Sequence, residues 1–187
     1  MKDPRVLVLP DWQGGGSVQW PRHWARAHGY TLVEQHDWHR PLRGDWLIQL
    51  EEAVLDAPGQ VVLVAQGLGC ALVAAWSAFT RHSAKVRAAL LVAPLDVGLP
   101  ALRDILPSWT PVASQRLPFK AMVVVPRSET TPAHSHDATP HESKHVAQAL
   151  ATAWGAQCVS VPTDENLTSN PCDWPAGHAL LNELMKD

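Results

Sequence analysis

The sequence has few cysteines, no long apolar segment and little net charge. Its cysteines, Cys70, Cys158 and Cys172, are odd in number and lack metal-motif spacing, which favours free thiols in a reducing compartment over a disulfide framework. No apolar run approaches the ~20 residues of a membrane-spanning helix. The net charge of −3 gives no electrostatic basis for binding nucleic acid or an acidic membrane surface.

The composition is that of one globular domain. With 187 residues, of which 46% are apolar and 18% charged, the chain is long enough to bury one core and too short for two. The first ten residues, MKDPRVLVLP, hold too short an apolar stretch, with the wrong flanks, for a signal peptide. We therefore expect a single cytoplasmic domain spanning residues 1–187.

Short strand-like runs alternate with helical segments along the chain. Strands are expected at residues 5–9, 31–34, 61–65, 86–92, 121–125 and 157–161, and helices at 21–28, 46–55, 68–79, 142–154 and 176–185. The strands are apolar on both faces, which predicts a mostly parallel sheet covered by helices on both sides. The fold class is thus α/β, a three-layer α/β/α sandwich.

The most informative segment is QVVLVAQGLGCALVAA, at residues 60–75. An apolar strand runs into a tight Gly-x-Gly turn and then directly into an apolar helix. This is the strand–turn–helix order of a nucleophile elbow, in which a Ser, Cys or Asp stands at the tip of the turn. Here Gly67 stands at the tip, and it has no side chain with which to attack a substrate.

With the elbow placed, the sequence resembles the small α/β-hydrolase-fold serine hydrolases related to retinoblastoma-binding protein nine. The similar segments are VLVLPDWQGGGSVQW, EQHDWHRPLRGDW, VVLVAQGLGC, ALLVAPLDV, WTPVASQRLPFKAMVVV, LATAWGAQ and DWPAGHALL, which together span nearly the whole chain. The resemblance implies a minimal α/β-hydrolase fold without a large lid. It also implies a catalytic triad in the chain order Ser, Asp, His.

The resemblance places all three triad positions and indicates that the triad is degenerate. The serine falls on Gly67 and the histidine on Asp164. The acid falls on Glu129 when counted from the fifth strand, and on Thr139, close to Asp137, when counted back from the WGA helix end. The difference implies an insertion of about ten residues within a His-rich stretch at about 128–141. Changes at two triad positions favour a decayed or repurposed site over a single knock-out.

The hydrolase interpretation also predicts an oxyanion hole. One backbone N–H near Trp12, in the loop after the first strand, and one at Leu68 would point at a substrate oxygen. Asp11, Gln13 and Gln66 complete the expected pocket. Because backbone donors need no particular side chain, such a niche can outlive the triad. Most of the nine tryptophans are expected in the core or pocket wall, with Trp12 the best candidate to face a ligand.

Three other chemistries are weaker. A dinucleotide site at the three glycines 14–16, with Glu34 as the ribose acid, lacks a required third glycine, since Gln19 stands there. Cys70 is better interpreted as a small buried residue than as a nucleophile. The His-rich stretch lacks the HExxH pattern and is better interpreted as a solvated loop than as a zinc site; its candidate ligands are His134, His136, Asp137, His141 and His145. We predict neither a metal nor a cofactor.

Two functions remain. The favoured one is a catalytically silent hydrolase homologue that binds a small molecule or a protein partner in the former active-site cleft. The alternative is an enzyme with a rebuilt, metal-assisted or acid–base site in the same cleft, with His134 or His136 assisting. Its candidate acids and bases are Asp11, Glu129, Asp137 and Asp164.

Overall fold

The computed structural model describes residues 3–12, 20–127, 140–162 and 174–186, and for 126–127, 140–143 and 162 only the backbone. Several positions predicted above lie outside these ranges. They are Gln13, the three glycines 14–16, Gln19, Glu129, His134, His136, Asp137, Thr139, Asp164 and Cys172. The proposed insertion therefore lies almost wholly outside the described residues, as do the acid and histidine positions of the triad.

Six parallel strands form the centre of the molecule, which confirms the predicted fold class. In chain order they are β1 (Arg5–Leu9), β2 (Thr31–Leu32), β3 (Val61–Gln66), β4 (Val86–Val92), β5 (Lys120–Arg127) and β6 (Gln157–Pro162). Their order across the sheet is β2-β1-β3-β4-β5-β6, and every pairing is parallel. Classical dinucleotide-binding sheets have the order 3-2-1-4-5-6, so the strand order also disfavours a dinucleotide site.

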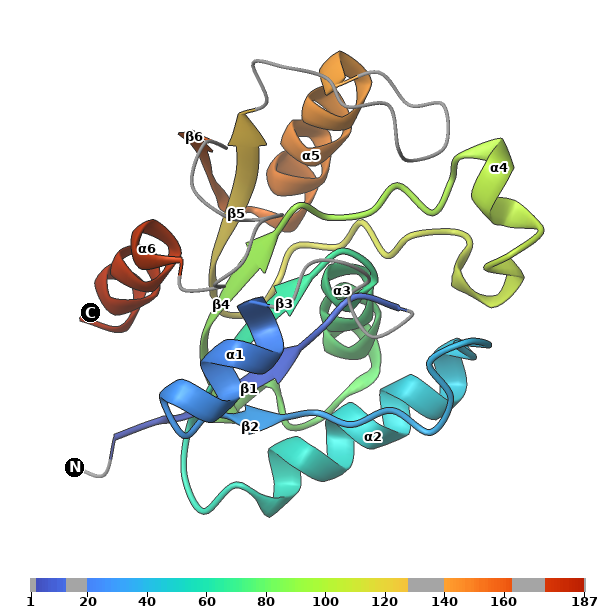
Figure 1. Cartoon of the computed structure of the whole chain (residues 1–187). Helices are drawn as coiled ribbons and strands as arrows, with labels where there is room; N and C mark the ends of the chain where they lie inside the picture. The colour runs from blue at the N-terminus through green and yellow to red at the C-terminus, as the bar shows by residue number, and fades with distance from the viewer. Residues whose placement is uncertain (1–2, 13–19, 128–139, 163–173, 187) are drawn as a thin grey trace.

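Helices cover both faces of this sheet (Figure 1). They are α1 (Trp20–Ala27), α2 (Arg43–Asp56), α3 (Leu68–Phe79), α5 (Pro140–Trp154) and α6 (Pro175–Met185), whereas the short α4 (Pro100–Arg103) lies in the connection from β4 to β5. One core cluster contains residues of α2, α3 and α5, and the other contains residues of α1 and α6. Along β3, Leu63 belongs to the first cluster and Val64 to the second, because successive strand side chains point to opposite faces.

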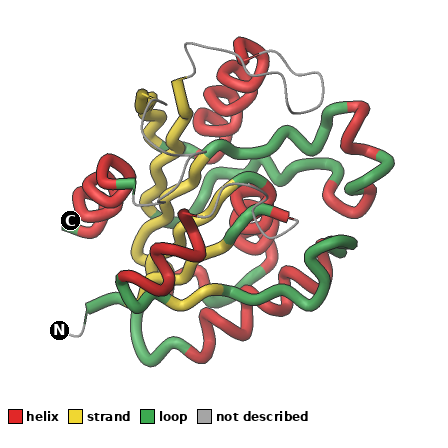
Figure 2. The backbone as a smooth tube through the Cα atoms, viewed as in Figure 1, coloured by secondary structure: helices red, strands yellow, loops and turns green. Residues whose placement is uncertain are grey.

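The predicted boundaries lie within three residues of those in the structure, and several differ by one to three residues. The second strand ends at Leu32 rather than at residue 34, because only two residues pair with β1 and Glu34 is exposed. Helix α2 begins at Arg43, three residues before the predicted start. Figure 2 shows the long loop-rich connection from β4 to β5, which carries α4 and a short 3-10 helix at Pro107–Trp109.

The tryptophans fill the core, as predicted for most of them. Six are at most 1% exposed: Trp20, Trp24, Trp46, Trp109, Trp154 and Trp174. Between α1 and the start of α6, the ring of Trp20 lies 4.9 Å from that of Trp24 and 5.2 Å from that of Trp174, both edge-on. Among the described residues, no helix is long and apolar enough to cross a membrane.

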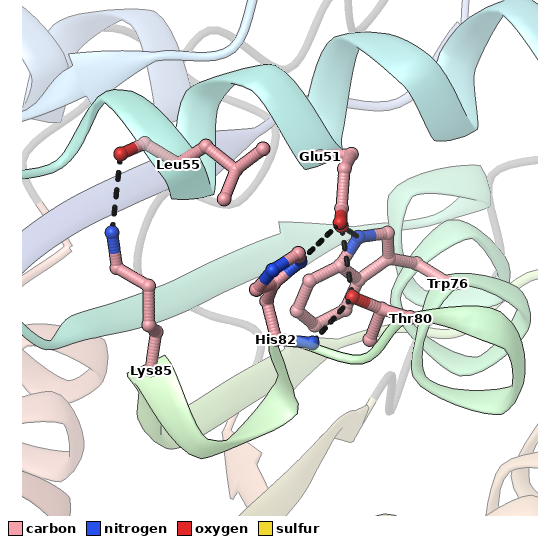
Figure 3. A network of polar contacts seen from close by, with 6 residues as sticks. All are labelled: Glu51, Leu55, Trp76, Thr80, His82 and Lys85. Atoms are coloured by element: carbon pink, nitrogen blue, oxygen red, sulfur yellow. Dashed lines mark hydrogen bonds and ion pairs between the residues drawn. The ribbon is translucent and has the colours of Figure 1, made fainter.

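A polar network joins α2 to the end of α3 (Figure 3). The Glu51 carboxylate accepts hydrogen bonds from Trp76 Nε1 and from Thr80 Oγ1, and it pairs with His82 Nδ1 at 2.6 Å. Lys85 lies beyond it and donates to backbone carbonyls that end α2. Burial raises the pKa of Glu51, but the hydrogen bonds from His82, Thr80 and Trp76 together lower it below its ordinary value. The ionised form is therefore the one that stabilises the fold.

Replacing Glu51 tests this network. We expect Glu51→Ala to lower the free energy of unfolding at pH 7 by about 2 kcal/mol, because the indole N–H of Trp76 loses its acceptor. Since the pKa of Glu51 is lowered by folding, this contribution is present at neutral pH and is lost as the pH falls through that lowered pKa. Urea unfolding at several pH values measures it. The exposed neighbour Glu52→Ala is the control, and equal effects of the two changes would refute a special role for Glu51.

Candidate functional site

Gly67 forms the tip of the turn between β3 and α3. Its φ of +54° and ψ of −118° lie in a region that residues with a Cβ atom rarely occupy. Its N–H donates to the carbonyl of Val92 at 3.1 Å, and its carbonyl accepts from Leu95 N at 3.3 Å and Cys70 N at 3.1 Å. The end of β4 therefore holds the turn in this conformation. The backbone has the geometry of a nucleophile elbow, with glycine at the nucleophile position.

Gly69 brings α3 directly against the end of β1. A Cβ atom on Gly69 would lie 2.6 Å from the carbonyl oxygen of Leu9. Any side chain at this position would therefore push the helix away from the strand. Because of this close approach, Asp11, two residues after β1, lies beside the elbow.

The carboxylate of Asp11 occupies both backbone donors that the hydrolase interpretation assigns to the oxyanion hole. Its Oδ1 atom accepts hydrogen bonds from Leu68 N at 2.7 Å and from Trp12 N at 2.8 Å. Leu68 is the first residue of α3, so the carboxylate also lies at the positive end of the helix dipole. The structure thus brings together four of the predicted site residues, and it places a side chain of the protein itself on the two N–H groups.

The same carboxylate fills the space in which a nucleophile would begin. A Cβ atom built on Gly67 would overlap the carboxyl carbon and both carboxyl oxygens of Asp11. A residue with a side chain at position 67 and this Asp11 conformation exclude each other. The observed position of the Asp11 side chain therefore requires glycine at position 67.

Burial alters the acid–base properties of the site. It raises the pKa of Asp11 to about 6, although the hydrogen bonds from Leu68 and Trp12 oppose the shift. Burial likewise raises the pKa of the Cys70 thiol, with a smaller contribution from the charge of Asp11. Cys70 is fully buried, and its Sγ lies 3.5 Å from the carbonyls of Ala65 and Val92. This confirms that Cys70 is a small buried residue of the core.

Two buried glutamines lie at or after the carboxyl ends of strands, Gln66 as the last residue of β3 and Gln35 three residues after β2. Gln66 precedes the elbow tip and is 9% exposed, and Gln35 follows β2 and is 8% exposed. The Oε1 atoms of both side chains lack a hydrogen-bond partner among the described residues. Gln66, one of the predicted site residues, therefore supplies an unpaired acceptor next to Gly67 in the chain.

One of the candidate zinc ligands of the His-rich stretch, His145, is exposed on α5. The described ranges contain no cluster of three or more His, Cys, Asp or Glu side chains suited to a metal ion. A surface hollow of about 690 Å³ lies at the starts of β5 and β6, lined by Arg116 and Lys120 among others. The hollow therefore lies at the amino ends of the strands, whereas Gly67 lies beyond their carboxyl ends.

Sequence reasoning included Asp11 in the pocket but missed its position on the two N–H groups. Asp11 and Leu68 are 57 residues apart, and no local pattern reports a hydrogen bond between them. The available signal was the acidic residue that directly follows an apolar strand and Pro10, in a chain that has glycine at the tip of the elbow.

Glycine substitutions separate backbone strain from the overlap with Asp11. Gly29 also has a positive φ, of +66°, but a Cβ there would meet nothing within 4 Å. We expect Gly29→Ala to cost about 1 kcal/mol of unfolding free energy and Gly67→Ala to cost about 3 kcal/mol. The excess should shrink by at least about 1 kcal/mol in an Asp11→Ala background. Chemical denaturation of the four variants measures this, and equal costs at the two glycines would show that Asp11 does not fill the space.

The raised pKa of Asp11 is measurable by carbon NMR of its carboxyl group. We expect a titration midpoint near 6, whereas Asp37, an exposed carboxylate whose pKa is lowered by hydrogen bonds from Arg40 and His39 backbone N–H groups, titrates below the ordinary range. Because folding raises the pKa of Asp11, its ionisation lowers stability by up to about 3 kcal/mol as the pH rises from 4 through 6. Asp11→Asn should remove this slope. A midpoint near 4 would contradict the burial of the carboxyl group.

Comparison with known proteins agrees with this geometry. The chain is similar to the crystal structure of a YdeN-like hydrolase from Pectobacterium atrosepticum, with a TM-score of 0.73 at 16% identity, covering 98% of this chain and 91% of that one. It is also similar to the ydeN gene product of B. subtilis, with a TM-score of 0.67 at 15% identity over 98% and 100% of the two chains. No curated protein matches the sequence. The sequence model of the serine hydrolase family matches residues 6–183, and the chain therefore belongs to the serine hydrolase family.

Proposed function

We propose that this protein is a pseudo-hydrolase, which retains the scaffold of a serine hydrolase but binds a small molecule or a protein partner instead of cleaving an ester or amide. In this proposal it is a relative of the group that includes retinoblastoma-binding protein nine, with a degenerate triad at Gly67, Glu129 and Asp164. The observation that carries the proposal is the Asp11 carboxylate, which occupies both the space above Gly67 and the two backbone donors beside it.

Two physical arguments support the loss of serine hydrolase chemistry. First, hydrolysis by this family needs a nucleophilic side chain at the elbow, and glycine has none. Second, the tetrahedral intermediate needs vacant N–H donors for its negative oxygen. Here Leu68 and Trp12 already donate to a carboxylate, and an ionised Asp11 would repel a second negative oxygen.

Active-site labelling tests the proposal. We expect neither labelling of the purified protein by a fluorophosphonate probe nor turnover of a short-chain nitrophenyl ester. Gly67→Ser alone should stay inactive, because the resemblance places Asp164 rather than a histidine at the position of the catalytic base and because the new side chain overlaps Asp11. Adding Asp164→His and Asp11→Gly would supply a base and free the donors, so only this triple variant is expected to gain a trace of activity. Substantial hydrolysis by the wild type or by Gly67→Ser would disprove the proposal.

A second candidate is an acid–base enzyme built around Asp11. The observation that favours it is the pKa of Asp11, about 6, which suits proton transfer near neutral pH. Under this candidate, a panel of nitrophenyl esters and acyl thioesters would be turned over with a pH profile that inflects near 6, and Asp11→Asn would abolish the activity. Activity that is equal in wild type and Asp11→Asn would count against it. Elemental analysis of the same preparation tests for a bound metal.

A further inference from the structure

We propose that Asp11 converts the former oxyanion niche into a receptor for a cationic head group, a primary ammonium or a guanidinium. This inference rests on the pseudo-hydrolase function proposed above and concerns the class of ligand that the same site takes. At the elbow, the two backbone N–H donors already bind Asp11, whereas one oxygen of the Asp11 carboxylate still has no donor among the described residues.

The niche at the elbow offers a hydrogen-bond acceptor where a serine hydrolase offers donors. In a serine hydrolase the two backbone N–H groups point at a substrate oxygen, so the niche offers donors and attracts negative charge. Here both N–H groups donate to one atom, Oδ1 of Asp11, at 2.7 and 2.8 Å, the lengths of charge-assisted hydrogen bonds. The donors are therefore satisfied, and the group that the niche offers instead is a carboxylate, which accepts hydrogen bonds.

The second carboxylate oxygen of Asp11, Oδ2, is available to a ligand. Asp11 Oδ2 accepts no hydrogen bond from any described residue, although the side chain is half-buried. When one carboxylate oxygen accepts two hydrogen bonds and the other accepts none, the second oxygen can still accept a hydrogen bond from an external donor. Because residue 67 is glycine, no side chain from the elbow covers the carboxyl group.

The negative charge of Asp11 lacks a nearby compensating cation among the described residues. No described Lys or Arg side chain contributes to the pKa of Asp11, and the two N–H groups do not offset the effect of burial. The negative charge is therefore under-compensated within the described part of the chain. Among the described residues, the titratable group that interacts with Asp11 is the Cys70 thiol of α3, whose raised pKa keeps it neutral. A ligand cation would supply the missing compensation.

An organic cation fits this site better than a metal ion does. A metal ion needs several ligating side chains, and the described ranges contain no group of three. An ammonium or guanidinium group needs only one hydrogen-bonded carboxylate for a charge-assisted contact. The location also suits a ligand, because parallel α/β sheets bind ligands beyond the carboxyl ends of their strands, where Asp11 lies.

Paired probes of opposite charge test the inference on the full chain. Benzylammonium and benzoate have similar size, and the backbone amide signals of Leu68 and Trp12 in proton–nitrogen NMR spectra report on the niche. At pH 7.5 we expect saturable shifts with benzylammonium and none with benzoate. At pH 5, one unit below the pKa of Asp11, the affinity for benzylammonium should fall about tenfold.

Charge-removing variants identify the carboxylate responsible. Asp11→Asn keeps an oxygen acceptor for both N–H groups, so we expect it to fold, as its thermal unfolding will show, and to bind benzylammonium at least tenfold more weakly. Asp37→Asn is the matched control, because Asp37 also accepts two backbone N–H groups but from His39 and Arg40 rather than from the elbow, and it should bind as the wild type does. Asp11→Gly should reverse the preference, since the freed N–H groups can then bind benzoate.

Several results would overturn the inference. Preference of the wild type for benzoate, absence of saturable binding of benzylammonium, or equal binding by wild type and folded Asp11→Asn would each refute a cation receptor. Fluorophosphonate labelling of the same preparation separates this failure from that of the proposed function. Labelling would remove the pseudo-hydrolase proposal itself, whereas benzoate binding without labelling would remove only the cationic ligand.

Discussion

Two hydrogen bonds to one oxygen atom determine the character of this protein's site. Leu68 and Trp12 donate their backbone N–H groups to Asp11 Oδ1, which ties the segment after β1 to the first turn of α3. The contact is possible because Gly69 lets α3 approach the end of β1 and because Gly67 leaves the space above the elbow free. The scaffold that positions a nucleophile and an oxyanion in serine hydrolases here positions a carboxylate instead. In the proposed pseudo-hydrolase, the absence of hydrolysis and the binding of a cation would both follow from this one arrangement.

The sheet and its covering helices could be predicted from the sequence because their signals are local. Runs such as VLVLP and VVLVAQ are too apolar for an edge position, and each stands next to a segment of helical period. Two of the boundaries that differed, at Leu32 and Arg43, lie at element ends that the residue pattern does not determine. The elbow was recognisable for the same reason, since strand, turn and helix are consecutive in the chain.

The site itself was predictable only in part. Sequence reasoning named Asp11, Trp12, Gly67 and Leu68, but a contact across 57 residues depends on the packing of β1 against β3 and leaves no trace in spacing. The raised pKa of Asp11 depends in turn on burial, which exists only in the folded chain. The sequence placed this carboxylate in the expected pocket, but its raised pKa follows only from the folded structure. The roles assigned to Glu129 and Asp164 stay predictions of the sequence alone.

The proposed chemistry of the site depends on where the carboxyl group of Asp11 lies when it is ionised. A high-resolution crystal structure of the wild-type protein at about pH 8, grown without small carboxylates or amines, tests this most directly. The account predicts that Oδ1 of Asp11 lies within about 3 Å of both Leu68 N and Trp12 N, above a glycine elbow with positive φ. An Asp11 side chain turned into solvent, with water or another group on the two N–H donors, would contradict it.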